Sequence, residues 1–131
     1  MLSSLSLVFS ADEYGEVSLT ASLDTGAFRG QCRYWCPASE FAGLAAALRS
    51  FPSSGQSVID DRWYDGCIRL RIEPIDSVGH FSVSVGLQEF DNDWTKCQSR
   101  FEVTYGDLDR FRTQLDGLLS QGTGEAMLSA S

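Results

Sequence analysis

Apolar and polar residues alternate along most of this chain, and this two-residue period restricts its fold more than any other feature of the sequence. From Leu5 to Phe9, and again from Val17 to Leu23, every second residue is apolar and most of its neighbours are serine or threonine. Successive side chains of a β-strand point to opposite faces of a sheet, so each segment predicts a strand with one buried face and one solvated face. The same pattern predicts further strands at residues 27–35, 57–60, 67–73, 80–88 and 97–103.

The period lengthens to about 3.6 residues in two places, which predicts two helices. The first helix follows Ser39, a candidate cap, and places Phe41 and Leu48 on one side before the chain reaches Pro52. The second spans Asp107–Leu119 and carries leucine and phenylalanine at helical spacing. We expect both apolar stripes to pack against a sheet.

Turn-forming residues separate the predicted strands at Asp12–Gly15, Asp24–Gly26 and Asp91–Asp93. Short turns of this kind join antiparallel neighbours, so we expect two meanders, each followed by a helix. The sequence therefore predicts an α+β fold, with antiparallel meander sheets of about six to seven strands and two helices packed on one face. We expect a single domain over residues 1–121 and a flexible C-terminal tail over residues 122–131, which are small and polar.

The length and composition indicate a folded protein. The chain has 131 residues, 43% of them hydrophobic, which is enough to bury a core without a metal or a disulfide. No stretch approaches the ~20 apolar residues that a membrane-spanning helix requires. The segment Met1–Phe9 has no basic residue and is interrupted by serines, so we expect no secretory signal and a cytoplasmic location.

The net charge of −8 restricts the classes of partner. Nucleic acid and anionic membranes are disfavoured, because their phosphates must be met by lysine and arginine. A basic protein partner is favoured instead, since a complementary field steers association. Solubility alone is the other explanation of such a charge.

The four cysteines do not form a recognisable metal motif. Cys32 and Cys36 lie four residues apart at the end of a predicted strand, which separates them by roughly 13 Å, too far for ligands of one zinc ion unless the chain turns sharply at Cys36-Pro37. Cys67 and Cys97 are isolated, and no Cys-x-x-Cys is present. We expect buried thiols that behave as small apolar side chains, with no metal and no cofactor.

Few residues could carry catalysis. His80 is the only histidine, and it follows a turn glycine at the start of a predicted strand, where a solvated role is common. A general base would need a cleft with a carboxylate or a serine beside it. Asp91 and Asp93 could chelate a hard cation, but no third ligand or distal glutamate follows them, so a turn is the better explanation. We expect a protein that is not an enzyme.

Loops rich in aromatic and acidic residues are the strongest candidates for a binding surface. Tryptophan, tyrosine and arginine are the residues most enriched at interface hot spots. The alternative for Trp63 is a place in the core that anchors its loop. Arg69 and Arg71 share one strand face, where they would be solvent-exposed or paired with acids of neighbouring strands. The candidate partner-binding residues are Asp60, Asp61, Arg62, Trp63, Tyr64, Asp65, Glu89, Asp91, Asp93 and Trp94.

The order of the predicted elements, and the residues that mark them, resemble a known group of small bacterial proteins. The matching positions are Phe28 and Gly30, Phe41 and Leu48, Gly79 and His80, and then Phe101, Leu108, Phe111 and Leu115. In this respect the chain is similar to immunity proteins of polymorphic toxins, in particular the WapI-like type and related families of unknown function. The resemblance implies a protein that is not an enzyme and that inhibits a cognate toxin by stoichiometric binding.

The leading hypothesis is therefore an acidic α+β domain that binds another protein, as an immunity or antitoxin-like inhibitor of a basic toxin. The alternative is a small-molecule or peptide-binding module with a pocket between the first helix and the sheet. Tyr34, Trp35 or Trp63 would line that pocket, with Arg69 or Arg71 pointing into it. The sequence also leaves a homodimer open.

Overall fold

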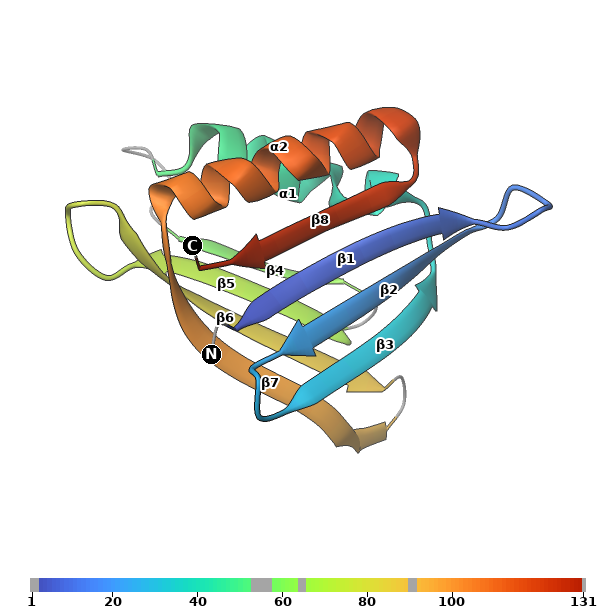
Figure 1. Cartoon of the computed structure of the whole chain (residues 1–131), viewed down its shortest axis with the longest axis horizontal. Coiled ribbons are helices and arrows are strands. Elements are labelled where there is room, and N and C mark those ends of the chain that lie inside the picture. Colours follow the sequence, from blue (N-terminus) through green and yellow to red (C-terminus); the bar gives the residue numbers. More distant parts are fainter. Residues whose placement is uncertain (1–2, 53–57, 64–65, 90–91, 131) are drawn as a thin grey trace.

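Two four-stranded antiparallel sheets and two α-helices make up the protein in the computed structural model, which describes residues 3–52, 58–63, 66–89 and 92–130. The two sheets lie one in front of the other, and both helices lie along one margin of the pair (Figure 1). The first sheet has the order β3-β2-β1-β8, and the second has the order β4-β5-β6-β7. The α+β class and the antiparallel meanders agree with the prediction, but the strands number eight rather than six to seven.

The elements follow the two periods of the sequence closely. The strands of the first sheet are β1 (Ser4–Ala11), β2 (Val17–Asp24), β3 (Arg29–Trp35) and β8 (Gly124–Ser129). The strands of the second sheet are β4 (Ile59–Trp63), β5 (Ile68–Pro74), β6 (His80–Glu89) and β7 (Asn92–Thr104). A 3-10 turn, η1 (Ala38–Phe41), leads into α1 (Ala42–Ser50), and α2 (Tyr105–Gln121) follows β7 directly. None of the described helices combines the length and apolar character needed to cross a membrane.

The last strand, β8, corrects the prediction of a flexible tail. It pairs antiparallel with β1, with Leu5 opposite Leu128 and Leu7 opposite Ala126. Ala126 and Leu128 are completely buried, so this segment completes the core of the first sheet. Its outer edge is met by α2, where the Gln114 side chain accepts a hydrogen bond from the backbone N–H of Met127 at 2.7 Å.

The core lies between the inner faces of the two sheets and is covered by the apolar stripes of the helices. Phe41, at the end of η1, lies at the centre of this core. Its ring contacts that of Phe9 of β1 edge-on, with 5.6 Å between the ring centroids, and stacks on the ring of Trp63 of β4, with 4.6 Å between the centroids. Phe111 and Leu115 of α2 are completely buried in the same cluster. Alternate residues of β1, β2, β5 and β6 are buried as expected, whereas the inward residues of β3 are only half-buried.

The two sheets come closest where β3 approaches β6 and β7. Gly30 of β3 faces Cys97 of β7 so closely that a Cβ atom on Gly30 would lie 2.5 Å from the Cβ of Cys97. Further along β3, the Tyr34 hydroxyl donates a hydrogen bond to the carbonyl of Gln88 at 3.0 Å. Gly30 is therefore needed for the close approach of two backbones, a role that its sequence context does not indicate.

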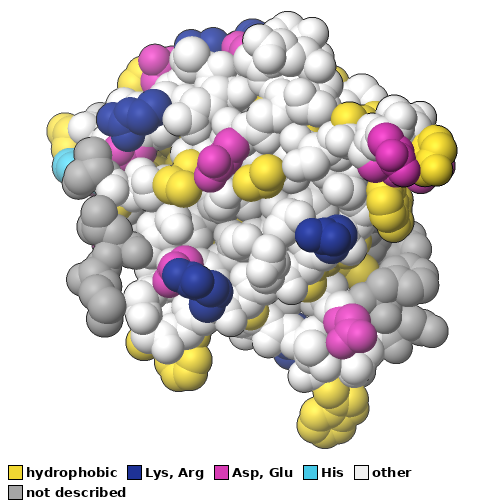
Figure 2. Space-filling model, turned by 45° about the vertical axis from the view of Figure 1, so that its right-hand side comes forward, with side chains coloured by type: hydrophobic (Ala, Val, Ile, Leu, Met, Phe, Trp, Pro, Cys, Tyr) yellow, Lys and Arg dark blue, Asp and Glu magenta, His cyan; other side chains and the backbone are white. Residues whose placement is uncertain are grey.

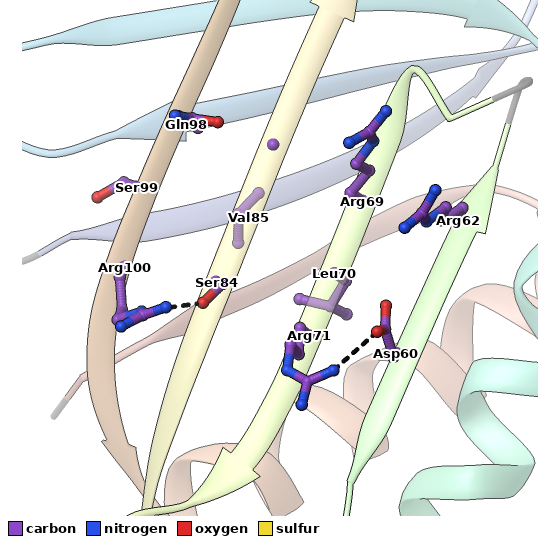
Figure 3. Close-up of a pocket in the computed structure, with 11 residues that line it drawn as sticks. Asp60, Arg62, Arg69, Leu70, Arg71, Ser84, Val85, Gln98, Ser99 and Arg100 are labelled. Atoms are coloured by element: carbon purple, nitrogen blue, oxygen red, sulfur yellow. Dashed lines mark hydrogen bonds and ion pairs between the residues drawn. The ribbon is translucent and has the colours of Figure 1, made fainter.

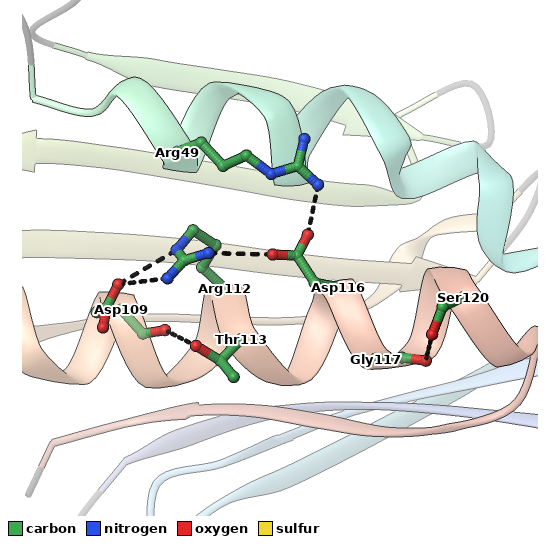
Figure 4. Close-up of polar contacts among 7 residues, drawn as sticks. All are labelled: Arg49, Asp109, Arg112, Thr113, Asp116, Gly117 and Ser120. Atoms are coloured by element: carbon green, nitrogen blue, oxygen red, sulfur yellow. Dashed lines mark hydrogen bonds and ion pairs between the residues drawn. The ribbon is translucent and has the colours of Figure 1, made fainter.

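Helix α2 is held at its start and along its length by polar contacts. The Thr104 side chain accepts from the backbone N–H of Asp107, and the Asp107 carboxylate accepts from the N–H of Thr104 at 2.8 Å, which forms a capping box. Further along, Asp116 accepts from Arg49 of α1 at 2.6 Å and from Arg112 at 3.0 Å, which joins the two helices (Figure 4).

Candidate functional site

The outer face of the second sheet gathers arginines from three of its four strands. Because strand side chains alternate, the inward residues of β5 are leucine and isoleucine, and the outward ones include Arg69 and Arg71. The register places Arg62 of β4 opposite Arg69, and Asp60 opposite Arg71. On β7, Arg100 faces the same side through its partner Ser84 of β6.

These side chains surround a hollow of about 590 Å³ on the solvent side of the sheet, which we call the arginine hollow (Figure 3). Its volume falls within the roughly 300–1,000 Å³ of small-ligand sites. Arg62 and Arg69 lie side by side on one flank, and Gln98 and Arg100 lie on the opposite strand (Figure 3). The lining residues are Asp60, Arg62, Arg69, Leu70, Arg71, Ser84, Val85, Gly86, Gln98, Ser99 and Arg100.

The charge of the arginine hollow is opposite to that of the whole chain. Four of the ten lysines and arginines of the sequence line it, against one carboxylate, that of Asp60. A smaller depression adjoins it, lined in part by Lys96, and the two share Arg69, Gly86 and Gln98. On the side of the molecule in Figure 2, by contrast, acidic and basic side chains are interspersed among uncharged atoms.

Only one of the four arginines is neutralised by acids. Arg71 donates to Asp60 at 2.8 Å and to Glu73 at 3.3 Å, and these hydrogen bonds raise the pKa of its guanidinium. Arg69 instead donates to the backbone carbonyl of Gly66 at 3.1 Å, and Arg100 donates to the Ser84 hydroxyl at 3.2 Å. Within the described ranges, Arg62, Arg69 and Arg100 have no ion pair with a carboxylate of the protein.

The row formed by Arg62, Arg69, Gly86 and Gln98 is electrostatically unfavourable in the free protein. Arg62 and Arg69 are direct cross-strand neighbours, and like charges in that position destabilise a sheet. Gly86 is opposite Arg69 on one side and Gln98 on the other, so no side chain fills the centre of the row. The sequence predicts that the arginines of β5 are either exposed or paired with acids. Arg71 is paired with acids, whereas Arg69 has no acidic partner among the described residues.

The candidate partner-binding residues of the first cluster belong to a strand, which corrects the prediction of a loop. Asp60–Trp63 lie in β4, where Asp60 and Arg62 face outward into the arginine hollow. Asp61 and Trp63 are half-buried on the other face, and Trp63 stacks on Phe41 as the core alternative anticipated. Burial, followed by the neighbouring charge of Asp60, raises the pKa of the Asp61 carboxyl. Tyr64 and Asp65 lie outside the described residues.

The described residues of the second predicted cluster lie at the same end of the second sheet as Trp63, where β6 ends and β7 begins. Glu89 ends β6 and is exposed, and Trp94 near the start of β7 has 93% of its surface exposed. Asp93 belongs to β7, and Asp91 lies outside the described residues. Neither Glu89 nor Trp94 lines the arginine hollow.

Gly86, Gln98, Ser84 and Arg100 were not among the sequence candidates, although a signal for them is present. Outward positions on adjacent strands of a meander meet across the sheet, and several of those positions here are arginine. Between the first helix and the sheet, where the alternative hypothesis expects a pocket, Phe41 stacks on Trp63. The hollow lies instead on the opposite face of the second sheet.

His80 lies beside an acid on the surface. Its Nδ1 is 2.7 Å from the Asp76 carboxylate, which also accepts from the backbone N–H of Val78. These contacts, led by the bond from Val78, lower the pKa of Asp76. Half of the His80 side chain is exposed, and it does not line the arginine hollow.

The thiols are placed as small core residues. None of the four cysteines forms a disulfide, and Cys36 and Cys67 are buried. Burial, followed by the charge of Glu40, raises the pKa of Cys36 to about 11, so this thiol stays protonated at neutral pH. Across the described part of the chain, no group of three or more histidine, cysteine or acidic side chains is placed to hold a metal ion.

Comparison with protein-family models finds no match, and comparison with curated proteins finds none that matches. The resemblance to immunity proteins therefore stays a prediction, and the function is argued from the geometry of the arginine hollow.

Proposed function

We propose that this protein acts by binding, and that its binding site is the arginine hollow, which receives an anionic segment of a partner protein. The carrying observation is the set of arginines without acidic partners around an unfilled centre. A planar guanidinium donates paired hydrogen bonds to carboxylate or phosphate oxygens, so such side chains are suited to anion recognition.

Electrostatics favour an anion in this place. Arg62 and Arg69 repel each other in the free protein, and an anion between them would relieve that repulsion. A hydrogen bond to a charged group contributes about 1.5–3 kcal/mol. Binding should also weaken with salt, because the site is open to solvent and its charges are screened.

The lining residues favour binding over catalysis. Asp60, the single carboxylate, is held by Arg71, and the Ser84 hydroxyl accepts from Arg100. The lining contains neither histidine nor cysteine, so a nucleophile with an adjacent base is not present among these eleven residues. We therefore retain the proposal of a protein that is not an enzyme.

The biological role that we propose remains inhibition of a toxin by stoichiometric binding, as the resemblance to immunity proteins implies. The arginine hollow changes the expected chemistry of the contact. A basic partner is expected from the net charge, whereas the segment that docks in the hollow should be acidic. Reduced cysteines fit a reducing compartment, so we place the protein in the cytoplasm.

An NMR titration tests the proposal. The ¹⁵N-labelled protein is titrated with a glutamate-rich peptide at low and at high salt, beside the double variant R62A/R69A. Arg33→Ala is the matched control, because Arg33 is an exposed arginine of the first sheet. We expect shifts in β4–β7 that are reduced by salt, absent from the double variant and kept in the control. Shifts confined to another face, or equal binding by all three proteins, would contradict the proposal.

A further inference from the structure

We infer that the arginine hollow recognises a phosphomonoester group, held over Gly86 by Arg62, Arg69, Lys96 and Gln98. This inference rests on the proposed function, because it names the chemical class of the anion that the same site binds. Its evidence is the arrangement of the donors around one glycine of the central strand β6.

The residues that carry the donors flank Gly86 on both sides. Arg69 is its direct neighbour on β5, with Arg62 one strand further, and Gln98 is its direct neighbour on β7. Adjacent strands are about 4.8 Å apart, so these residues surround a space no wider than about three strand spacings. Lys96 adds a cation from the adjoining depression, which shares Arg69 and Gly86 with the arginine hollow.

The number of cations favours a dianion over a carboxylate. One guanidinium can satisfy both oxygens of a carboxylate by a bidentate contact. Here two guanidiniums, one ammonium and one amide belong to residues of three strands on the face around Gly86, and together they match a group with three terminal oxygens and nearly two negative charges. The lining contains no aromatic side chain on which a nucleobase could stack, so the site is suited to the phosphoryl group rather than to a nucleotide base.

Gly86 provides the space that such a group requires. A Cβ atom placed on Gly86 would lie 3.8 Å from the Cβ of Arg69, an ordinary contact that the protein tolerates. The added methyl group would nevertheless occupy the floor on which the phosphoryl oxygens rest. Gly86→Ala should therefore reduce binding without harming the fold, which separates a role in the site from a role in packing.

The experiment compares ligands that differ only in the anionic group, and it uses the full chain. Binding of a phosphoserine peptide is measured by calorimetry beside the same peptide with glutamate in that position, inorganic phosphate, and a short single-stranded oligonucleotide. We expect the phosphoserine peptide to bind about tenfold more tightly than the glutamate peptide. The oligonucleotide should bind more weakly, because each of its phosphodiesters carries only one charge.

The pH dependence provides a second readout. The second pKa of a phosphomonoester is near 6, so the advantage of phosphoserine should be lost between pH 7.5 and 5.5, whereas glutamate stays ionised over this range. The charged groups that face the site are Asp60 and Arg62 of β4, the arginines of β5 and β7, and Lys96. His80 lies six residues from Gly86 along β6, about 20 Å away. His80→Gln is the control for any effect of its imidazole on the pH dependence.

The variants connect the affinity to the site. R62A/R69A and Gly86→Ala should each weaken phosphoserine binding about tenfold or more, and Arg33→Ala should leave it unchanged. Circular dichroism melts establish that each variant is folded. Inorganic phosphate binding as tightly as the phosphopeptide would identify a free phosphate compound as the ligand, and tighter phosphopeptide binding would identify a modified protein; both support the inference.

The failures are distinguishable. Equal affinity for the phosphoserine and glutamate peptides would overturn the phosphomonoester inference, as would an oligonucleotide that binds more tightly than the phosphoserine peptide. In either case, binding of the glutamate peptide at β4–β7 would still support the proposed function. No binding of any anion at β4–β7 would overturn both.

Discussion

The contact between Gly30 and Cys97 predicts that the two sheets of the protein cannot accommodate a single extra methyl group at their closest point. In Gly30→Ala, the new Cβ would meet the Cβ of Cys97 at 2.5 Å and its Sγ at 3.0 Å. Ordinary contacts begin near 3.4 Å, so β3 and β7 would have to separate locally by about 1 Å.

The expected loss can be estimated from this geometry. Inserting a methyl group into a tightly packed interior costs about 1–3 kcal/mol, because side chains and backbone must shift. Replacing glycine by alanine in a strand without a clash stabilises the folded state by about 0.5–1 kcal/mol. Gly86→Ala, in the neighbouring strand β6, provides this reference, since its Cβ meets only an ordinary contact at 3.8 Å. The two variants should differ by about 2 kcal/mol or more in the free energy of unfolding.

Equilibrium unfolding in urea measures this difference, provided that fluorescence and circular dichroism give the same transition. A second substitution tests the cause. Cys97→Gly removes the Cβ atom that clashes with the added methyl group, so it should raise the stability of the Gly30→Ala protein but not that of the wild type. Cys97→Ala keeps the Cβ atom and should therefore not raise the stability of the Gly30→Ala protein. A Gly30→Ala protein at least as stable as Gly86→Ala would refute the reasoning, because the sheets would then have room at this point.

Three further changes test other parts of the fold. Leu128→Ala should destabilise the protein by about 2–5 kcal/mol in urea unfolding, because this side chain of β8 is completely buried, whereas Met127→Ala on the exposed face should change little; equal effects would contradict the assignment of β8. Thr104→Ala removes the capping box and should cost about 1 kcal/mol, measured as a lowered Tm; an unchanged Tm would argue against the cap. Asp61→Asn should stabilise the protein at neutral pH, because the raised pKa of Asp61 means that the folded state disfavours its ionised carboxylate. The stability advantage of the variant over the wild type should shrink as the pH falls towards the pKa that Asp61 has in the unfolded chain. An advantage that is constant over pH 3–8 would show that ionisation is not its cause.

Most of the fold follows from the period of the sequence, because a segment with four or five alternating residues has enough inward side chains to identify its buried face. Strand β8 has only two, Ala126 and Leu128, among glycine and serine, so its composition indicates a loop. Its pairing with β1 depends on residues from the other end of the sequence, which no local pattern contains. In β4, the acidic residues and the arginine favour the prediction of a loop, because charged residues are common in loops. The alternation that indicates a strand is carried only by Ile59, Asp61 and Trp63, which share the inner side.

The candidate site was harder to predict than the fold, since net charge is an average over the whole surface. A chain with a charge of −8 favours a basic partner, but it can still carry a basic face if its strands place their arginines in register. The outward positions of Arg69 and Arg71 were predictable from alternation. The centre of the arginine hollow was not, because a glycine such as Gly86 adds nothing to a charge or hydropathy pattern and matters only through the space that it leaves.

The pairing of β8 with β1 has a consequence during biosynthesis. Ser4 and Ser129 are opposite each other, so β1 is synthesised more than one hundred residues before β8, the strand that covers its outer edge. Until then a nascent chain presents an open edge whose inward residues are Leu5, Leu7 and Phe9, a combination that promotes association with other chains. We therefore expect chains stalled after α2 to aggregate or to be held by chaperones, and native structure to form only after translation has passed residue 129.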